Sequence, residues 1–88
     1  MKTQRKTLEP LAQSALLVVY ELASHEQPAH VGSVAAELGI SRTEAAALLR
    51  TLEAAGLLWA ERCRLSMQGL AVAIRLWSQR ARARRRAA

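Results

Sequence analysis

The sequence AAELGISRTEAAALLRTLEAAGLL, residues 35–58, decides the fold of this chain. It predicts two helices that meet across a tight turn, with Ala35 as the small residue at the crossing and Gly39 as the residue that tolerates positive φ. Ser41 and Glu44 form an S-x-x-E capping box, which predicts the start of the second of these helices. The apolar positions expected to face inward are Val34, Leu38, Ile40, Ala45 and Leu48.

Two helices are expected before the turn at Gly39, a long first helix and the short helix that enters the turn. A long first helix is predicted to begin near Thr7, as its cap, and to run to about Ser24, with Pro10 in its first turn. A short helix from about Ser33 to Leu38 then leads into the turn. The first helix has apolar residues on several sides, which predicts burial on more than one side. Its expected main stripe is Leu8, Leu11, Ala15, Val18 and Leu22.

A small hairpin and a last helix are expected after the quoted stretch. Gly56 is predicted to close the preceding helix. Residues 57–66 have the pattern of two short strands that turn near Glu61 and Arg62. The last helix is predicted from Met67, after a cap at Ser66, to at least Gln79. Leu70, Ile74 and Trp77 line one of its faces, and Val72 and Leu76 line another.

Residues 35–58 resemble the helix-turn-helix and recognition helix of MarR-like and related winged-helix transcriptional regulators. The segment LSMQGLAVAI, residues 65–74, is similar to the Leu-Ser/Thr-x-x-Gly segment that leaves the wing in those families. The resemblance covers roughly residues 11–77 and agrees with the order of the predicted elements, which is that of a winged helix-turn-helix, a mainly α fold with a small β-hairpin. We expect this domain over residues 1–79, and the composition indicates a basic arginine-rich tail over residues 80–88. The chain is shorter than a full MarR protein, so only the DNA-binding module is carried over, and not a ligand response.

The same resemblance implies which residues meet DNA, because the recognition helix of such modules, here residues 41–55, lies in the major groove. The expected contacts are Ser41, Arg42, Thr43, Ala46, Ala47 and Arg50 on that helix, Arg62 and Arg64 on the wing, and Arg80 and Arg82 in the tail. Arg42 and Arg50 can bind phosphate or guanine bidentately. The two alanines offer only apolar contact, so base readout is expected to be thin and affinity to depend on the DNA backbone and the tail.

The charge balance also favours a polyanionic partner. The chain of 88 residues carries 13 basic and 7 acidic residues, for a formal net charge of +6. The arginines that crowd the C-terminus are Arg80, Arg82, Arg84, Arg85 and Arg86. They could form a phosphate-binding arm, a solvated end of the last helix or a site for RNA. A disordered basic end that touches nucleic acid loosely is the favoured interpretation.

Several other side chains allow a functional and a structural interpretation. Cys63 could be a redox-sensing thiol beside two arginines, but a small apolar strand residue is favoured. His25, Glu26 and His30 could bind a metal, but their spacing fits no known ligand pattern. Trp59 and Trp77 could stack on bases, and packing in a core or a subunit interface is favoured instead.

The sequence therefore predicts sequence-specific or semi-specific binding of duplex DNA by a small transcriptional regulator, as a repressor. A homodimer through the first and last helices is expected, because these carry more apolar faces than one small core can use. The alternatives are a winged-helix module that binds a protein partner and an RNA-binding protein that uses the tail. No catalytic set, metal site or cofactor motif is present, so an enzyme is not expected. A single cysteine and the lack of a signal peptide or a spanning apolar stretch favour the cytoplasm and no membrane partner.

Overall fold

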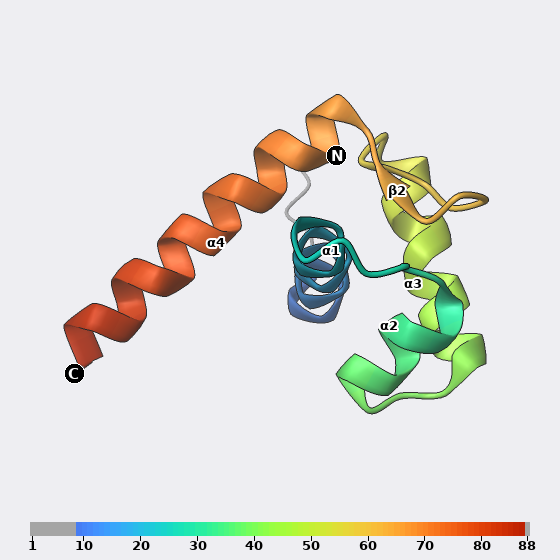
Figure 1. Cartoon of the computed structure of the whole chain (residues 1–88), viewed down its shortest axis with the longest axis horizontal. Coiled ribbons are helices and arrows are strands. Elements are labelled where there is room, and N and C mark those ends of the chain that lie inside the picture. The colour runs from blue at the N-terminus through green and yellow to red at the C-terminus, as the bar shows by residue number, and fades with distance from the viewer. Residues whose placement is uncertain (1–8, 88) are drawn as a thin grey trace, which may run out of the picture.

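The computed structural model describes residues 9–87, which form four helices and one small antiparallel hairpin (Figure 1). In chain order the elements are α1 (Pro10–Ser24), α2 (Val31–Leu38), α3 (Arg42–Ala54), β1 (Leu58–Trp59), β2 (Arg64–Leu65) and α4 (Met67–Ala87). This order confirms the expected mainly α fold with a small β-hairpin, a winged helix-turn-helix. No helix within these residues is long and apolar enough to cross a membrane.

The core lies between α1, α2, α3, the hairpin and the first half of α4. Its largest fully buried side chains are Leu16, Val19, Val34, Leu49, Leu52 and Leu58. The stripe of α1 that faces this core is not the expected one. Ala12, Ala15, Leu16 and Val19 are buried, whereas Leu11 is 43% exposed and Val18 and Leu22 are only half-buried. Leu8 and Thr7 lie outside the described residues, and the described helix has Glu9 as its N-cap, without a side-chain capping bond.

The ends of the two central helices are fixed by two capping boxes. The expected box of α3 is confirmed, because the Glu44 amide donates to Ser41 Oγ over 3.1 Å and the Ser41 amide donates to Glu44 Oε1 over 3.1 Å. Gly39 has the expected left-handed conformation, with φ at 69°. Helix α2 begins earlier than expected, because His30 caps it. The Ser33 amide donates to His30 Nδ1, and the His30 amide donates to Ser33 Oγ.

The hairpin forms the wing, with Leu58 opposite Leu65 and Trp59 opposite Arg64. Its turn falls where expected, although the segment has no glycine. The Arg62 amide donates to the Trp59 carbonyl over 3.1 Å, and the Cys63 amide donates to the Ala60 carbonyl over 3.2 Å. Cys63 closes the turn in the left-handed region, with φ at 52°. Cys63 is therefore a buried turn residue and not the strand residue that was expected.

Helix α4 is longer than the sequence suggested. It begins after Ser66 and continues without interruption to Ala87, so the expectation of a disordered arginine-rich end is wrong. Arginine and alanine are both strong helix formers, and three arginines in the last turn interact favourably with the negative end of the helix dipole. The division of the chain into residues 1–79 and 80–88 stays a prediction, but α4 crosses that boundary as one helix.

The two apolar faces of α4 have different surroundings. Ala73 is fully buried, and Val72 and Leu76 pack against the core. The other face carries Met67, Leu70, Ile74 and Trp77, which are all exposed. Trp77 is 48% exposed and Trp59 is 56% exposed, so neither tryptophan packs in the core of this chain, and the alternative of a subunit interface stays a prediction.

Candidate nucleic-acid interface

The outward face of α3 is set by the burial of its inward face. Ala45, Leu49 and Leu52 are buried, and the residues two positions before each of them lie about half a turn away around the helix. These residues are Thr43, Ala47 and Arg50, and all three are exposed. Ala46 is half-buried, so its contribution to an outward face is smaller than that of Ala47. Helix α3 therefore presents a short surface of one hydroxyl, one methyl and one guanidinium.

The N-terminal end of α3 is held by its capping box, and the Ser41 hydroxyl makes hydrogen bonds within this box. The Ser41 hydroxyl accepts from the Glu44 amide over 3.1 Å and donates to Glu44 Oε1 over 3.3 Å. The capping box therefore engages the Ser41 hydroxyl, which sequence reasoning had assigned to DNA. It also draws the Glu44 carboxylate back onto the helix start, where it adds negative charge close to the expected path of the phosphates.

Arg42 extends from the start of α3 toward the first turn of α2. Its guanidinium carbon lies 3.8 Å from the position that a Cβ of Gly32 would occupy, and the nearest atom of the His30 ring lies 3.1 Å from the same position. A cation beside the amino end of a helix is well placed to bind an anion, because the helix dipole and the guanidinium both attract it. Sequence reasoning missed His30 and Gly32, and the H-x-x-S spacing of the cap was the available signal.

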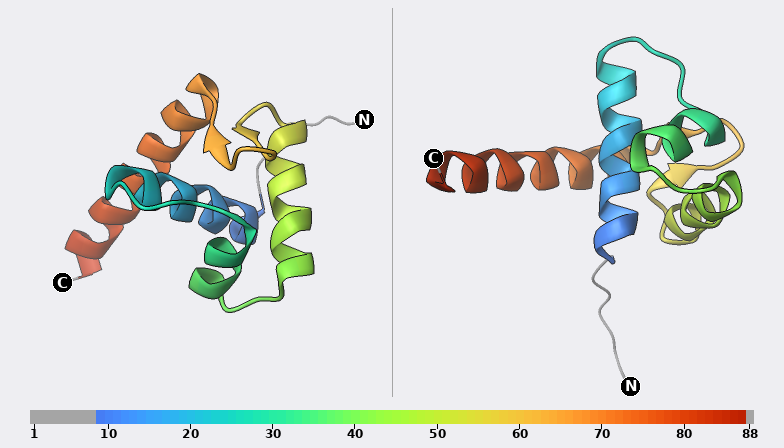
Figure 2. Two further views of the ribbon diagram at one scale, coloured as in Figure 1. Left: turned by 45° about the vertical axis from the view of Figure 1, so that its right-hand side comes forward. Right: turned by 90° about the horizontal axis from the view of Figure 1, so that it is seen from below.

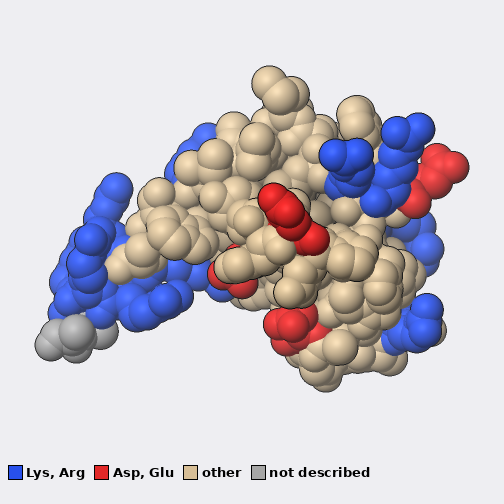
Figure 3. All heavy atoms as spheres, viewed as in Figure 1, with Lys and Arg blue, Asp and Glu red and all other residues tan. Residues whose placement is uncertain are grey.

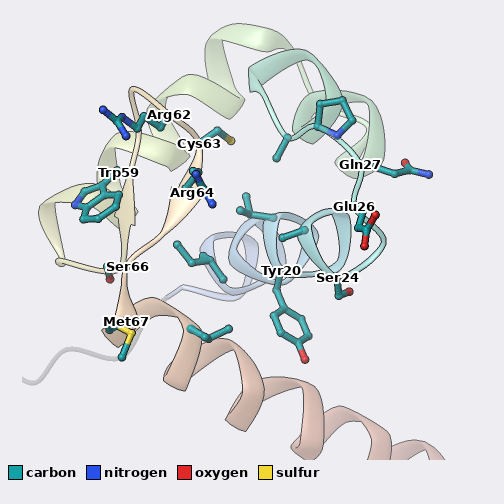
Figure 4. A pocket seen from close by; sticks show the side chains of 16 residues that line it. Tyr20, Ser24, Glu26, Gln27, Trp59, Arg62, Cys63, Arg64, Ser66 and Met67 are labelled. Carbon is teal, nitrogen blue, oxygen red and sulfur yellow. The ribbon is translucent and has the colours of Figure 1, made fainter.

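The wing places its two arginines differently. Figure 4 shows Arg62 pointing away from a cavity that lies between the wing, the end of α1 and the start of α4, and Arg64 lying over that cavity. The cavity has a volume of about 860 Å³ and also borders on Tyr20 and Trp59. The Arg62 side chain therefore points outward, and contact of either wing arginine with DNA stays a prediction.

Cys63 and the two histidines have structural positions. Burial raises the pKa of the Cys63 thiol, which disfavours the thiolate that a redox-sensing cysteine needs, even with two arginines beside it in the sequence. The His25 ring lies 2.9 Å from the Glu21 carbonyl oxygen, and the His30 ring caps α2. Within residues 9–87 no group of three or more His, Cys, Asp or Glu side chains is arranged to hold a metal ion.

The two tail residues of the expected site are far from the others. Arg80 donates to Ser14 Oγ of α1 over 3.4 Å, and Arg82 is exposed on the next turn of α4. The views of Figures 1 and 2 agree that this half of α4 leaves the domain on the side opposite α3. The ten expected contact residues thus form two separate surfaces, one on α3 and the wing and one at the end of α4.

Charge is divided in the same way. Residues 9–61 carry seven Glu and only two Arg, whereas residues 62–88 carry eight Arg and no acidic residue. In Figure 3 basic side chains gather over the wing and the outer edge of α3 and again over the far end of α4, with acidic and uncharged side chains between them. Residues 9–61 are therefore acidic as a whole, although α2 and α3 by themselves carry three Glu and two Arg, and the wing and α4 provide most of the positive charge.

The order of elements, the glycine turn between α2 and α3, the wing and the exposed face of α3 define a winged helix-turn-helix DNA-binding protein. The chain belongs to the family of the IclR helix-turn-helix domain, whose model matches residues 15–61, just over half of the chain. It is therefore a DNA-binding domain of the class that regulates transcription. The matching family is the IclR type, and the MarR-like resemblance of the sequence motifs is not confirmed. The searches of the curated proteins and of the solved structures gave no match.

Proposed function

We propose that this protein is a homodimeric repressor that occupies a DNA operator, with α3 in the major groove. The observation that carries the proposal is the outward face of α3, where Thr43, Ala47 and Arg50 are exposed on successive turns of a helix fixed at both ends. A helix in this position of the motif reads base edges with its N-terminal half. The protein would act by occupancy and would need no catalytic group.

The contacts available on this face indicate how much sequence it can read. Arg50 can bind the edge of a guanine or a phosphate, and the methyl group of Ala47 can pack against a thymine methyl. Arg42, Thr43 and Arg62 lie where they would contact the backbone on either side. With one strong base-reading side chain, specificity would be moderate, and DNA shape would contribute to it.

The exposed apolar face of α4 supports the dimer. Leu70, Ile74 and Trp77 line this face, and Leu11 on α1 is similarly exposed. A small domain gains stability when a second copy covers such surface, because the hydrophobic contribution is about 25 cal/mol per Å² of apolar area buried. A twofold pair could also present two α3 helices to successive major grooves, about 34 Å apart.

Binding to a fluorescent duplex of mixed sequence, measured by anisotropy over a series of salt concentrations, tests the DNA surface. The double variant Arg42→Ala, Arg50→Ala is compared with Arg84→Ala, Arg85→Ala, which removes the same charge at the far end of α4. We expect the α3 variant to bind at least about tenfold more weakly and its salt slope to fall by about 0.9 for each phosphate that it no longer neutralises. Equal effects of the two variants would contradict the proposed surface.

Repression is tested with an operator. Selection from random duplexes should enrich a site with two related halves, and a promoter that overlaps this site should lose transcription when the protein is added. Activation of that promoter, or selection of an unrelated single half-site, would contradict the dimeric repressor.

A second candidate function is a winged helix that binds another protein. The acidic balance of residues 9–61 and the alanines of α3 favour it, because both weaken attraction to phosphate. In that case DNA binding would be weak and unaffected by the Arg42 and Arg50 substitutions. The same anisotropy experiment therefore distinguishes the two functions.

A further inference from the structure

The arginine-rich part of α4 is not explained by the helix-turn-helix family. The family match ends at Glu61, and the eight arginines of residues 62–88 all follow it. A segment of this length without any acidic residue attracts polyanions, because no carboxylate within the segment offsets its charge. Two of these arginines, Arg62 and Arg64, lie on the wing, and the other six are carried on the regular helix α4.

The last turns of this helix hold their arginines away from the rest of the domain, whereas Arg75, nearer its start, borders a cavity that Glu9 and residues of α3 also line. Arg80 contacts Ser14, but Arg82, Arg84, Arg85 and Arg86 are exposed and make no hydrogen bond or ion pair within residues 9–87. The helix end projects from the domain on the side opposite α3, as both figures of the fold show (Figures 1 and 2). A duplex that lies on α3 is therefore not the one that this end of α4 reaches in the same protomer.

Three of the exposed arginines lie in one row along the helix. Arg75, Arg82 and Arg86 are separated by seven and four residues, which places them on one face over about 17 Å of helix length. The exposed apolar residues Leu70, Ile74 and Trp77 lie on a different face, so a dimer partner on that face would leave the row open. A straight row of guanidinium groups matches a line of phosphates, each of which arginine can bind bidentately.

We propose that this row, Arg75, Arg82 and Arg86, binds the backbone of a second DNA duplex, so that the regulator bridges two DNA segments. The first duplex lies on α3 and the wing, and this first contact rests on the proposed function. The second contact recognises phosphates and not bases, because the row offers only guanidinium groups. This second contact would let a regulator bound at one site also bind a distant stretch of the same DNA, so that the DNA between them forms a loop.

Bridging is measured with the full chain as capture of a fluorescent duplex by a second duplex that is immobilised on beads. The row variant Arg75→Gln, Arg82→Gln, Arg86→Gln is compared with the control Arg80→Gln, Arg84→Gln, Arg85→Gln, which removes the same charge from other faces of α4. Glutamine keeps helix propensity, and circular dichroism checks the helix in both variants. We expect the row variant to lose capture at least about tenfold while it binds a single duplex within about threefold of the native affinity. The control should keep at least about half of the native capture.

Three results would overturn the bridging proposal. They are unchanged capture by the row variant, an equal decrease in capture for both triple variants, and preferential capture of duplex RNA over duplex DNA. The Arg42→Ala, Arg50→Ala variant separates this proposal from the proposed function. If that variant binds a single duplex as tightly as the native chain, the α3 surface fails, whereas the row is judged by the comparison of the two triple variants.

Discussion

Gly69 of α4 is in direct contact with the backbone of Leu57, and this contact fixes where α4 leaves the domain. A Cβ at position 69 would overlap the carbonyl oxygen of Leu57, which is backbone and has no rotamer with which to move aside. The same carbonyl oxygen accepts a hydrogen bond from the Ser66 amide over 3.1 Å. The start of α4 is therefore joined to the segment after α3 by this close backbone contact and by hydrogen bonds from Ser66 to Leu57 and to Gly56.

We predict that Gly69→Ala destabilises the protein even though the position is helical. Alanine would favour the helix by about 1 kcal/mol, but the added methyl group would force two backbone segments apart. Overpacking of this kind costs more than the helix gains, so we expect a net loss of at least about 2 kcal/mol and a fall in Tm of about 10 °C. Thermal unfolding followed by circular dichroism measures it, with Gln68→Ala on the exposed side of the same turn as the control. A higher Tm for Gly69→Ala would show that helix propensity outweighs the contact.

Ser66 should be the most important hydroxyl for the stability of the wing junction. Its Oγ donates to the Gly56 carbonyl over 2.7 Å and accepts from the Gly69 amide over 3.0 Å, so it caps α4 and ties it to the turn after α3. We expect Ser66→Ala to lower the free energy of unfolding by about 1–2 kcal/mol, and Ser66→Thr to restore most of it. Ser24→Ala is the control, because its exposed hydroxyl bonds only to Glu21 within its own helix. Urea unfolding gives the values, and a Ser66→Ala protein as stable as the control would disprove this role.

These contacts show which parts of the fold could be predicted from the sequence. The turn at Gly39 and the capping box of Ser41 and Glu44 were predicted correctly, because each depends on residues within a few positions of each other. The buried face of α1 was not, because apolar residues surround that helix and only its neighbours decide which of them are buried. The helical end of α4 was missed because its composition suggested disorder, although its residues are good helix formers.

The candidate site was predictable to the same extent. The outward direction of Arg50 follows from the periodicity of α3, which is a local property. The separation of Arg80 and Arg82 from α3 depends on the direction in which α4 leaves the domain, and this is set by the contact between Gly69 and Leu57. The left-handed backbone at Cys63 also had no signal in the sequence, because the turn lacks the glycine that usually marks such a position.

The thiol of Cys63 should make the stability of the protein depend on pH in the alkaline range. Its pKa is raised by burial in the folded state, so the folded protein keeps its proton at pH values where the unfolded chain loses it. Stability should therefore be independent of this group below the ordinary thiol pKa of about 8.5 and should fall as the pH rises above it.

Urea unfolding of the native chain and of Cys63→Ala between pH 7 and pH 10 tests this sign. Alanine and cysteine have the same backbone cost at a positive φ, so the comparison isolates the thiol. The alkaline fall should be smaller in Cys63→Ala, and the native thiol should react with iodoacetamide at least about tenfold more slowly than in urea. An equal alkaline fall in both proteins, or fast alkylation of the folded chain, would show that the thiol is open to solvent.

The exposed apolar face of α4 should determine the oligomeric state of the protein. Ile74 is 46% exposed and lies between Leu70 and Trp77, so a glutamate there would be tolerated by the single chain but would place a charge in the centre of the proposed interface. Sedimentation should show a dimer for the native chain and a dimer dissociation constant at least about 100-fold higher for Ile74→Glu, which corresponds to about 2.7 kcal/mol.

Gln79→Glu adds the same charge on another face of α4 and should remain dimeric. If Ile74→Glu and Gln79→Glu weaken the dimer equally, the effect is one of net charge and the apolar face is not the interface. If the native chain is a monomer at high concentration, the exposed stripe is left for another partner, and two α3 helices cannot be held at successive grooves in the way proposed.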